Sequence, residues 1–391
     1  MSDLKILSSH PVQYHVPFFR ELISAGLDIE VGYYHQGTAG RVARDTGFGI
    51  DIAWDVDLLN GYPHRIFIKD TVNYQWLEQI KAAPQLLSWA LQDGQTPLLL
   101  MGWFTELIWL IWFIRVVRQA PIIVMCETTP LSFAATRKPR WRLFLLNWLL
   151  QHTTSNLFIG SRNQAFLLER GILKERLFPA PYSIDNFRFA AEVKRLLPDR
   201  PRLCRKYALD SELPTYLFCG KLISKKRPLQ LLDAYLAAGL ADRAQLLYVG
   251  EGELRQELEQ RIRALGLKHV HLLGFLNQND MPLAYVLGEL LCLLSESTET
   301  WGLVVNEALA CGRPVVVSDR VGCGPDLVGT ENGWVTPLDD HDQLTKTLRQ
   351  AFEQRVDWNK MGEVGRKRVS NNTFLEMASG VLSALRFIRE T

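Results

Sequence analysis

The feature that most constrains the fold is an alternation of short apolar segments with longer segments of helical periodicity, which occurs twice along the chain. In the first half, strand-like segments such as 4–8, 97–101 and 122–126 alternate with helical patterns such as 16–25 and 103–119. Strands that alternate with helices form parallel β-α-β units, because each helix carries the chain back to the edge where the next strand begins.

The second half repeats the alternation. Its strand-like segments include 216–219, 245–249, 290–294 and 314–318, and a helical pattern follows at 303–311. The sequence therefore predicts an α/β protein with two doubly wound sheets in tandem. In such sheets ligands bind beyond the carboxyl ends of the strands, and two facing sheets would form a cleft between the domains.

The alternation is interrupted at residues 188–206, where two prolines and many basic residues occur without a clear apolar period. Such a break is typical of a domain boundary. We predict an N-terminal domain at 1–190, a linker at 191–212 and a C-terminal domain at 213–370. A last helix at 371–391 would then be free to pack back on the N-terminal domain.

Length, charge and cysteine usage narrow the class of protein. A chain of 391 residues is long enough for two domains. The 44 Lys and Arg against 42 Asp and Glu leave a net charge of +2, too small for a dedicated nucleic-acid binder. The six cysteines include no C-x-x-C pair, and the first residues lack the apolar segment of a signal peptide. We therefore expect a cytoplasmic protein with reduced thiols and no metal site.

Residues 103–117 are the most membrane-like segment, but they include Glu106 and Arg115. A helix that spans a membrane needs about 20 mostly apolar residues, which is more than this segment offers. The pattern favours a largely buried helix of an α/β layer, with a position at a membrane surface as the alternative.

The segment most suggestive of chemistry, residues 295–319, follows a predicted strand and opens a helix. Glu299 lies in the loop after the strand, Gly302 begins the helix, and Glu307 lies about one turn into it. Glycine lets backbone N–H groups approach an anion closely, and a helix N-terminus carries partial positive charge. This loop could hold a diphosphate, with the two carboxylates on sugar hydroxyls. The alternative is that both acids are solvated residues at a helix start.

A second loop of the same kind, residues 218–228, places Lys221 and Lys226 after the predicted strand 216–219. These cations could neutralise a diphosphate, and a solvated basic loop is the alternative. The Val-Gly-Glu-Gly sequence at 249–252 ends a further strand. It is not the G-x-G-x-x-G fingerprint, so a nicotinamide cofactor is weakly supported.

Taken in chain order, these motifs resemble those of the family-4 retaining glycosyltransferases, also called glycosyltransferase group 1. The shared features are Gly220-Lys221 with Lys226, the glycines of 249–252, the Gly274-Phe275 turn, the segment from Glu299 through Trp301, Gly302 and Leu303 to Glu307, and residues 312–316. The resemblance covers roughly residues 155–340. It implies the GT-B architecture, in which two Rossmann-like doubly wound domains face a cleft.

The resemblance also implies a role for each matching residue. Glu299, Lys226 and Lys221 would form the catalytic set, with Glu299 on the donor sugar and the lysines on the leaving diphosphate. The donor would also be bound by Gly220, Gly250, Phe275, Trp301, Gly302, Leu303 and Glu307, of which Phe275 would receive the base and Glu307 the ribose. The family usually has Arg in place of Lys221, and lysine lacks the bidentate fork of a guanidinium. Such enzymes need no metal ion and no cofactor besides the nucleotide-sugar substrate.

The N-terminal half departs from the family pattern. Where many relatives have a glycine pair after the first strand, residues 8–15 are Ser-Ser-His-Pro-Val-Gln-Tyr-His. We predict that His10 in this loop and Glu127, which follows another strand, contact the acceptor, because loops at strand ends commonly carry function. Ordinary structural hydrogen bonding is the alternative for both residues.

Residues 137–150 combine four basic residues with Trp141, Phe144 and Trp148. A helix of this composition would suit the surface of an anionic membrane, where a lipid-linked acceptor is found. A core-packing helix with a basic start is the alternative.

The resulting prediction is a retaining hexosyltransferase that moves a sugar from a nucleotide-diphosphate donor to a hydroxyl of a glycan or lipid-linked acceptor. Its pathway would be surface-polysaccharide or glycolipid assembly, in the cytoplasm or at the inner face of the membrane. The alternatives are a sugar-nucleotide epimerase and a non-catalytic sugar-nucleotide or glycan-binding protein on the same scaffold. The sugar, the base and the acceptor stay open.

Overall fold

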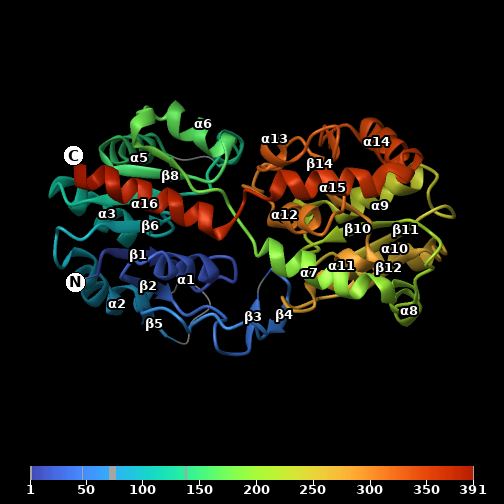
Figure 1. Ribbon diagram of the computed structural model, residues 1–391, viewed down its shortest axis with the longest axis horizontal. Coiled ribbons are helices and arrows are strands. Elements are labelled where there is room, and N and C mark those ends of the chain that lie inside the picture. Colours follow the sequence, from blue (N-terminus) through green and yellow to red (C-terminus); the bar gives the residue numbers. More distant parts are fainter. Residues whose placement is uncertain (1, 46, 70–75, 137–138, 391) are drawn as a thin grey trace. The chain divides into compact units, whose positions relative to one another are not determined.

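The computed structural model describes residues 2–45, 47–69, 76–136 and 139–390. The chain forms two compact units, each with its own parallel sheet and apolar core (Figure 1). The N-terminal unit comprises Met1–Arg44, Asp51–Ser183 and Thr373–Thr391, and the C-terminal unit comprises Asp45–Ile50 and Ile184–Asn372.

The sheet of the N-terminal unit has seven strands in the order β5-β2-β1-β6-β7-β8-β9, and neighbouring strands run parallel. In chain order the strands are β1 (Leu4–Ser8), β2 (Ile29–His35), β5 (His64–Ile68), β6 (Leu98–Met101), β7 (Ile122–Met125), β8 (Ser155–Phe158) and β9 (Leu177–Pro179). β1 is buried along its whole length. Helices on both faces bury a parallel sheet, which explains the continuous apolar strands.

The helices of this unit are α1 (Val16–Ser24), α2 (Trp76–Leu91), α3 (Glu106–Val117), α4 (Pro130–Ala134), α5 (Arg140–His152), α6 (Ser161–Glu169) and α16 (Phe374–Glu390). The last of them, α16, comes from the far end of the chain and packs against α1 and β9 (Figure 1). The ring of Phe387 lies 5.6 Å from that of Phe178. A Cβ atom at Gly380 would overlap the carbonyl of Pro179, so glycine permits the close approach of α16 to β9.

The sheet of the C-terminal unit has six parallel strands in the order β12-β11-β10-β13-β14-β15. They are β10 (Thr215–Cys219), β11 (Gln245–Val249), β12 (Val270–Gly274), β13 (Leu290–Leu293), β14 (Val315–Ser318) and β15 (Gly333–Thr336). This is the Rossmann order, in which the chain builds outward first on one side of β10 and then on the other. A topological switch point therefore lies between β10 and β13.

The helices of the C-terminal unit are α7 (Asn186–Leu196), α8 (Arg200–Lys206), α9 (Pro228–Ala237), α10 (Arg255–Ala264), α11 (Met281–Leu287), α12 (Leu303–Ala310), α13 (Gly324–Leu327), α14 (His341–Glu353) and α15 (Trp358–Val369). A short β3–β4 pair (Ala43–Asp45 and Ile50–Ile52) brackets residues 45–50. The core of this unit joins the sheet to α9 and α14 through Tyr216, Tyr235 and Leu348, and Tyr216 donates a hydrogen bond to the carbonyl of Leu348 (2.7 Å).

The linker predicted at residues 191–212 is wrong. This segment contains the second half of α7 and all of α8, and it lies inside the C-terminal unit, which the chain enters at Ile184. In α7, Phe189 and Val193 are both buried. They are one helical turn apart and therefore share the face that packs against the unit.

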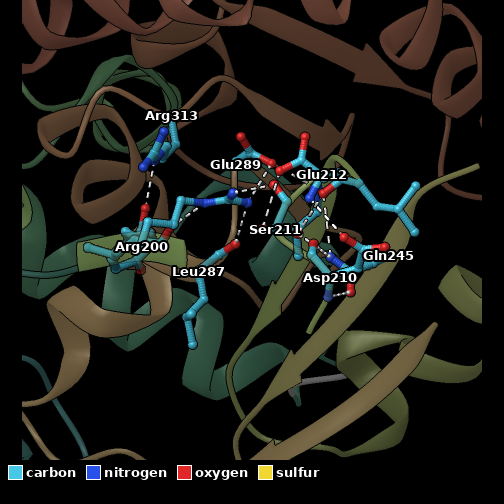
Figure 2. Close-up of polar contacts among 12 residues, drawn as sticks. Arg200, Asp210, Ser211, Glu212, Gln245, Leu287, Glu289 and Arg313 are labelled. Carbon is cyan, nitrogen blue, oxygen red and sulfur yellow. Dashed lines mark hydrogen bonds and ion pairs between the residues drawn. The ribbon is translucent and has the colours of Figure 1, made fainter. Parts of the chain in front are cut away.

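The two prolines of this segment begin helical turns rather than a linker. Pro198 lies in a 3-10 turn, and Pro201 lies in the first turn of α8, where a missing N–H costs nothing. α8 is anchored by Arg200, whose guanidinium donates to the carbonyl of Ser211 (3.0 Å) and pairs with Glu289 (2.9 Å), as Figure 2 shows. The basic residues that suggested a solvated linker thus include one that fixes the helix.

The apolar segment 103–117 forms α3, of which only one face is buried. Arg115 is buried on that face, and its guanidinium donates to the carbonyls of Ala90 (2.8 Å), Thr96 (2.7 Å) and Pro121 (2.7 Å). These bonds explain how a charged group is tolerated in an apolar helix. In the part of the chain that is described, no helix combines the length and apolar character needed to cross a bilayer.

Candidate functional site

The candidate site lies at the switch point of the C-terminal sheet. Strands β10 and β13 are parallel neighbours, with Tyr216 opposite Leu290. Their carboxyl ends therefore lead into adjacent loops, at the place where doubly wound sheets bind ligands. All three predicted catalytic residues occupy these loops, with Lys221 and Lys226 in the loop after β10 and Glu299 in the loop after β13.

Lys226 and Glu299 form an ion pair, with the ammonium donating to Oε2 of the carboxylate. Only 14% of the lysine side chain and 16% of the glutamate side chain are exposed. Burial alone would raise the pKa of Glu299, but the charge and hydrogen bond of Lys226, together with the hydrogen bond of Ser295 and the charge of Lys225, lower the pKa overall. Glu299 is thus an anion at neutral pH, held beside a cation that a phosphate could also bind.

The two loops are fixed to each other by backbone and side chains. The amide of Glu296 donates to the carbonyl of Lys225 (2.9 Å), which bridges the loops beside the ion pair. Arg227 has a left-handed backbone (φ 53°), and its guanidinium bonds Glu296 (3.2 Å) and Asp339 (3.1 Å). The charge of Arg227 is therefore paired with Glu296 and Asp339, and the charge of Lys226 is paired with Glu299.

Glycines allow the loops after β10 and β11 to touch. The amide of Gly220 donates to Val249 (2.9 Å), and the amide of Gly250 donates to Gly274 at the end of β12 (2.8 Å). Gly250 has a φ of 135°, and a Cβ atom there would overlap the carbonyl oxygen of Gly220. The predicted binding residues Gly220 and Gly250 thus lie next to each other beside Lys226. We call the backbone at these two residues the glycine floor.

The loop of Glu299 leads into α12 through Gly302, which begins the helix with a left-handed backbone (φ 102°). The loop after β14 supports it, since the amide of Gly322 donates to the carbonyl of Glu299 (3.1 Å). Leu303 is the first residue of α12. The first turn of a helix offers N–H groups and partial positive charge, which suit an oxyanion.

The indole of Trp301 is buried. Its side chain is 4% exposed and donates from Nε1 to Oδ1 of Asn306 (2.9 Å). The indole therefore packs inside the unit and fixes the start of α12. Any contact of Trp301 with a donor would have to come from its backbone.

Glu307 is also fully buried. Its Oε2 accepts a hydrogen bond from the hydroxyl of Tyr285 on α11 (2.6 Å). Burial, followed by the negative charge of Glu307, raises the pKa of Tyr285 well above its usual value, so the phenol stays a donor. Sequence reasoning missed Tyr285, because a tyrosine within an apolar helical pattern looks like any core residue.

The segment 45–50, which belongs to the C-terminal unit, contacts both Lys221 and Phe275. The ammonium of Lys221 bonds Asp45 (2.9 Å) and lies 4.7 Å from the ring centre of Phe48. The ring of Phe48 in turn lies 5.1 Å from that of Phe275. The residues predicted to receive the diphosphate and the base are thus covered by an acid and an aromatic ring from far away in the sequence.

In the N-terminal unit, His10 and Glu127 each join a polar cluster. His10 stacks on His35 with ring centres 5.1 Å apart, and its Nδ1 bonds the hydroxyl of Ser9 (3.0 Å). Burial, followed by the charge of Glu127 and its hydrogen bond to the phenol, raises the pKa of Tyr182 well above normal. The phenol also bonds Nε2 of His15 (3.0 Å).

The side chains of this cluster come from three distant parts of the sequence. Tyr182 follows β9, whereas His15 follows β1 and Glu127 follows β7, so only the parallel sheet brings the three together. Burial, followed by the charge of His10, lowers the pKa of His15 to about 4. The imidazole is therefore neutral at physiological pH, able to accept or donate a hydrogen bond.

Most of the C-terminal unit is similar in sequence to known proteins. Residues 199–368 match the family described as glycosyl transferases group 1. An alpha-D-kanosaminyltransferase of Streptomyces kanamyceticus is 32% identical over 162 residues, 40% of each chain. A GDP-mannose-dependent alpha-(1-6)-phosphatidylinositol dimannoside mannosyltransferase of Mycobacterium tuberculosis is 31% identical over 138 residues, 34% of this chain and 35% of that one. The chain thus spans 40% or less of the length of these two relatives.

The fold is shared more widely than the sequence. The crystal structure of Anabaena HepE in complex with UDP has a TM-score of 0.74 over 99% of this chain and 100% of that one, with 16% identity. The predicted GT-B architecture of two Rossmann-like domains is therefore confirmed. The matched residues 199–368 include Lys226 and Glu299, and this match confirms the resemblance of the motifs to the glycosyl transferases group 1 family.

Proposed function

We propose that the protein is a retaining glycosyltransferase that moves a sugar from a nucleotide-diphosphate donor to an acceptor hydroxyl. The observation that carries the proposal is the Lys226–Glu299 pair at the switch point of the C-terminal sheet. A cation for the diphosphate and a carboxylate for sugar hydroxyls stand side by side there, next to the glycine floor and the start of α12. The family match of this unit and the UDP bound in HepE support a nucleotide sugar as donor.

In the proposed reaction, the acceptor oxygen forms a bond to the anomeric carbon while the bond from that carbon to the diphosphate oxygen breaks. The diphosphate leaves with the electron pair and takes the acceptor proton, so charge and atoms balance. Lys226, Lys221 and the first turn of α12 would stabilise the developing negative charge. Glu299 would hold the donor sugar so that the acceptor attacks on the face from which the diphosphate departs, which retains the configuration.

No metal ion is needed in this proposal. The lysines and the helix start supply the positive charge that a divalent cation supplies in other sugar transferases. Addition of a chelator is therefore expected to leave the transfer rate unchanged, which a rate assay with and without EDTA measures.

The acceptor in this proposal is a glycan or a lipid-linked sugar of a surface polysaccharide or glycolipid, reached from the cytoplasmic side of a membrane. A relative named for a phosphatidylinositol dimannoside supports a lipid-linked acceptor. We assign the polar cluster around Tyr182, with His10 and Glu127 at its edges, to contact with the acceptor. The support for this assignment is its position after the carboxyl ends of strands β1, β7 and β9.

The first experiment is a thermal-shift screen of UDP-, GDP- and ADP-sugars, followed by transfer assays with the donor that binds. A ligand at 100 times its dissociation constant adds about 2.7 kcal/mol to the free energy of unfolding. Lys226→Gln and Glu299→Gln should each abolish transfer. Glu289→Gln, which breaks the pair with Arg200 in the same unit, is the matched control and should keep it.

The outcomes separate the rival functions. Full activity in both site variants would contradict the proposed role of Lys226 and Glu299 in transfer. A change in the donor sugar without any acceptor would indicate an epimerase, and donor binding without turnover on any acceptor pool would indicate a binding protein.

A further inference from the structure

Helix α3 presents a continuous apolar stripe on its exposed side. Leu110, Phe113 and Val117 are 46%, 42% and 59% exposed. Their spacing of three and four residues places them on one face of the helix, opposite the buried Arg115. Exposed single apolar residues are ordinary, but three on one face of a helix form a patch.

Helix α5 adds a second stripe. Trp141 and Phe144 are 64% and 74% exposed, while Leu146, Leu149 and Leu150 are buried on the other side. The leucines of α5 thus pack against the rest of the unit, and these two aromatic rings are exposed to solvent. Of the segment 137–150 predicted to bind a membrane, Arg137 and Lys138 lie outside the described residues.

The two stripes form one surface, because α3 and α5 pack together. The ring of Phe113 on α3 lies 5.7 Å from that of Trp148 on α5. At the other end, Arg142 of α5 pairs with Glu106 of α3 (2.6 Å). We call this surface, defined by Leu110, Phe113, Val117, Trp141 and Phe144, the α3–α5 face.

The exposed charges of α3 and α5 are mostly positive. Arg118 at the end of α3 and Arg140 at the start of α5 are exposed, and the guanidinium of Arg142 lies 5.6 Å from the ring centre of Trp141. Glu106, the one acid of the described helices α3 and α5, is already paired with Arg142. The apolar stripe is thus flanked by arginines and carries almost no negative charge.

We infer that the α3–α5 face docks on the surface of an anionic lipid bilayer. Tryptophan and phenylalanine insert at the boundary of headgroups and acyl chains, and flanking arginines reach the lipid phosphates. A second copy of this chain fits less well, because a two-fold interface would bring the same arginines against each other. The inference rests on the proposed function only in that a lipid-linked acceptor lies at such a surface.

The test is co-sedimentation of the full chain with vesicles of phosphatidylcholine, alone or mixed with phosphatidylglycerol, without any donor present. We expect binding to the anionic vesicles that weakens with salt. The double variant Trp141→Ser with Phe144→Ser should lower the partition coefficient about tenfold or more. The double variant Arg118→Gln with Arg140→Gln should flatten the salt dependence. The matched control is Phe187→Ser, which removes an aromatic ring that is 84% exposed in the C-terminal unit.

Absence of binding to anionic vesicles, or equal loss in Phe187→Ser, would overturn the inference. A dimer in light scattering that the Trp141 and Phe144 variant disperses would assign the face to a second copy and overturn it as well. Donor binding in the thermal-shift screen is measured separately. If the protein binds donor but no vesicles, membrane docking is contradicted and the proposed function stands. If it binds anionic vesicles but no donor, the proposed function is contradicted and membrane docking stands.

Discussion

Lys226 and Glu299 are 73 residues apart in the sequence and form an ion pair in the loops after two adjacent strands. A diphosphate that reaches Lys226 therefore meets an ammonium that already has a counter-charge. Binding would convert the pair into a three-membered arrangement of phosphate, ammonium and carboxylate. The carboxylate then stays in place for the sugar, because the same lysine orients it.

Replacing Glu299 by Gln is expected to lower the free energy of unfolding by about 3 kcal/mol at pH 7, because the ammonium of Lys226 is left buried without its counter-charge. The folded protein lowers the pKa of Glu299, so the stabilisation is present above the ordinary pKa of 4.5 and is lost as the pH falls through the lower folded value. The difference between wild type and variant should therefore shrink below pH 4.5. Urea denaturation at pH 7 and pH 3.5 measures both effects.

The control for this prediction is Glu296→Gln. Glu296 pairs with Arg227, but its side chain is 41% exposed. Solvent screens such a pair, so its loss should cost less than about 1 kcal/mol. An equal loss of stability in both variants would contradict the distinction between the buried and the exposed pair.

Gly250→Ala is expected to abolish donor binding and to destabilise the C-terminal unit. The new methyl group would overlap the carbonyl of Gly220, so the loops after β10 and β11 would have to separate. Gly239→Ala is the matched control, because Gly239 also has a positive φ of 72° but has open space around the Cβ position. The control should cost only the left-handed backbone penalty of about 1 kcal/mol. Donor titration and thermal unfolding of both variants decide between a steric and a purely conformational effect.

Asp45→Asn is expected to strengthen the binding of a nucleoside diphosphate. In the present structure the ammonium of Lys221 is paired with Asp45, and a neutral side chain would release it for the phosphate. The pair is partly exposed, so the dissociation constant should fall about two- to fivefold. Calorimetric titration with UDP, GDP and ADP measures the change.

Asp57→Asn is the control for this variant. Asp57 accepts backbone hydrogen bonds from Leu59 and Asn60, much as Asp45 accepts them from Gly47 and Phe48. Its replacement should leave nucleotide affinity unchanged. Weaker binding in Asp45→Asn would show that the acid helps to form the site instead of competing with the donor.

The N-terminal unit is expected to lose stability between pH 6.5 and about pH 4. Burial, followed by the charges of His10 and Arg41, lowers the pKa of His35 to about 4. Below pH 6.5 the unfolded chain therefore binds a proton at His35 that the folded unit does not, so His35 lowers stability by at most about 1.4 kcal/mol for each pH unit of acidification. His15, whose pKa is also about 4, adds a slope of the same kind. His35→Gln should reduce this slope by the part due to His35 in denaturant titrations from pH 7 to pH 4, and the part due to His15 should remain. An unchanged slope would show that His35 is protonated in the folded unit.

The general fold was predictable because both sheets are parallel and buried, so their strands are continuous apolar segments separated by helices. The family resemblance alone placed Lys226 and Glu299 in one catalytic set, and the structure gives the reason, because they follow the neighbouring parallel strands β10 and β13. The predicted linker was wrong because proline has two uses. Proline disrupts a helix from within but is tolerated in the first turn, which is where Pro201 lies in α8.

The rest of the site could not be found in the sequence. Asp45 lies 176 residues before Lys221, and nothing in its local pattern distinguishes it from other loop acids. Tyr285 and Tyr182 sit in apolar surroundings, and their hydroxyls matter only because the fold places Glu307 and Glu127 beside them. Such contacts depend on register and helix rotation, which a periodic pattern leaves undetermined.

The return of α16 to the N-terminal unit has a consequence for biosynthesis. The C-terminal unit is built almost entirely from the uninterrupted stretch Ile184–Asn372, whereas the N-terminal unit needs Thr373–Thr391 to cover α1 and β9. During synthesis on the ribosome, the first part of the N-terminal unit is made early, but the unit cannot complete its fold until its last segment has been made. Until then its uncovered apolar surface would be a binding site for chaperones, and the later-made unit is the one that can finish folding first.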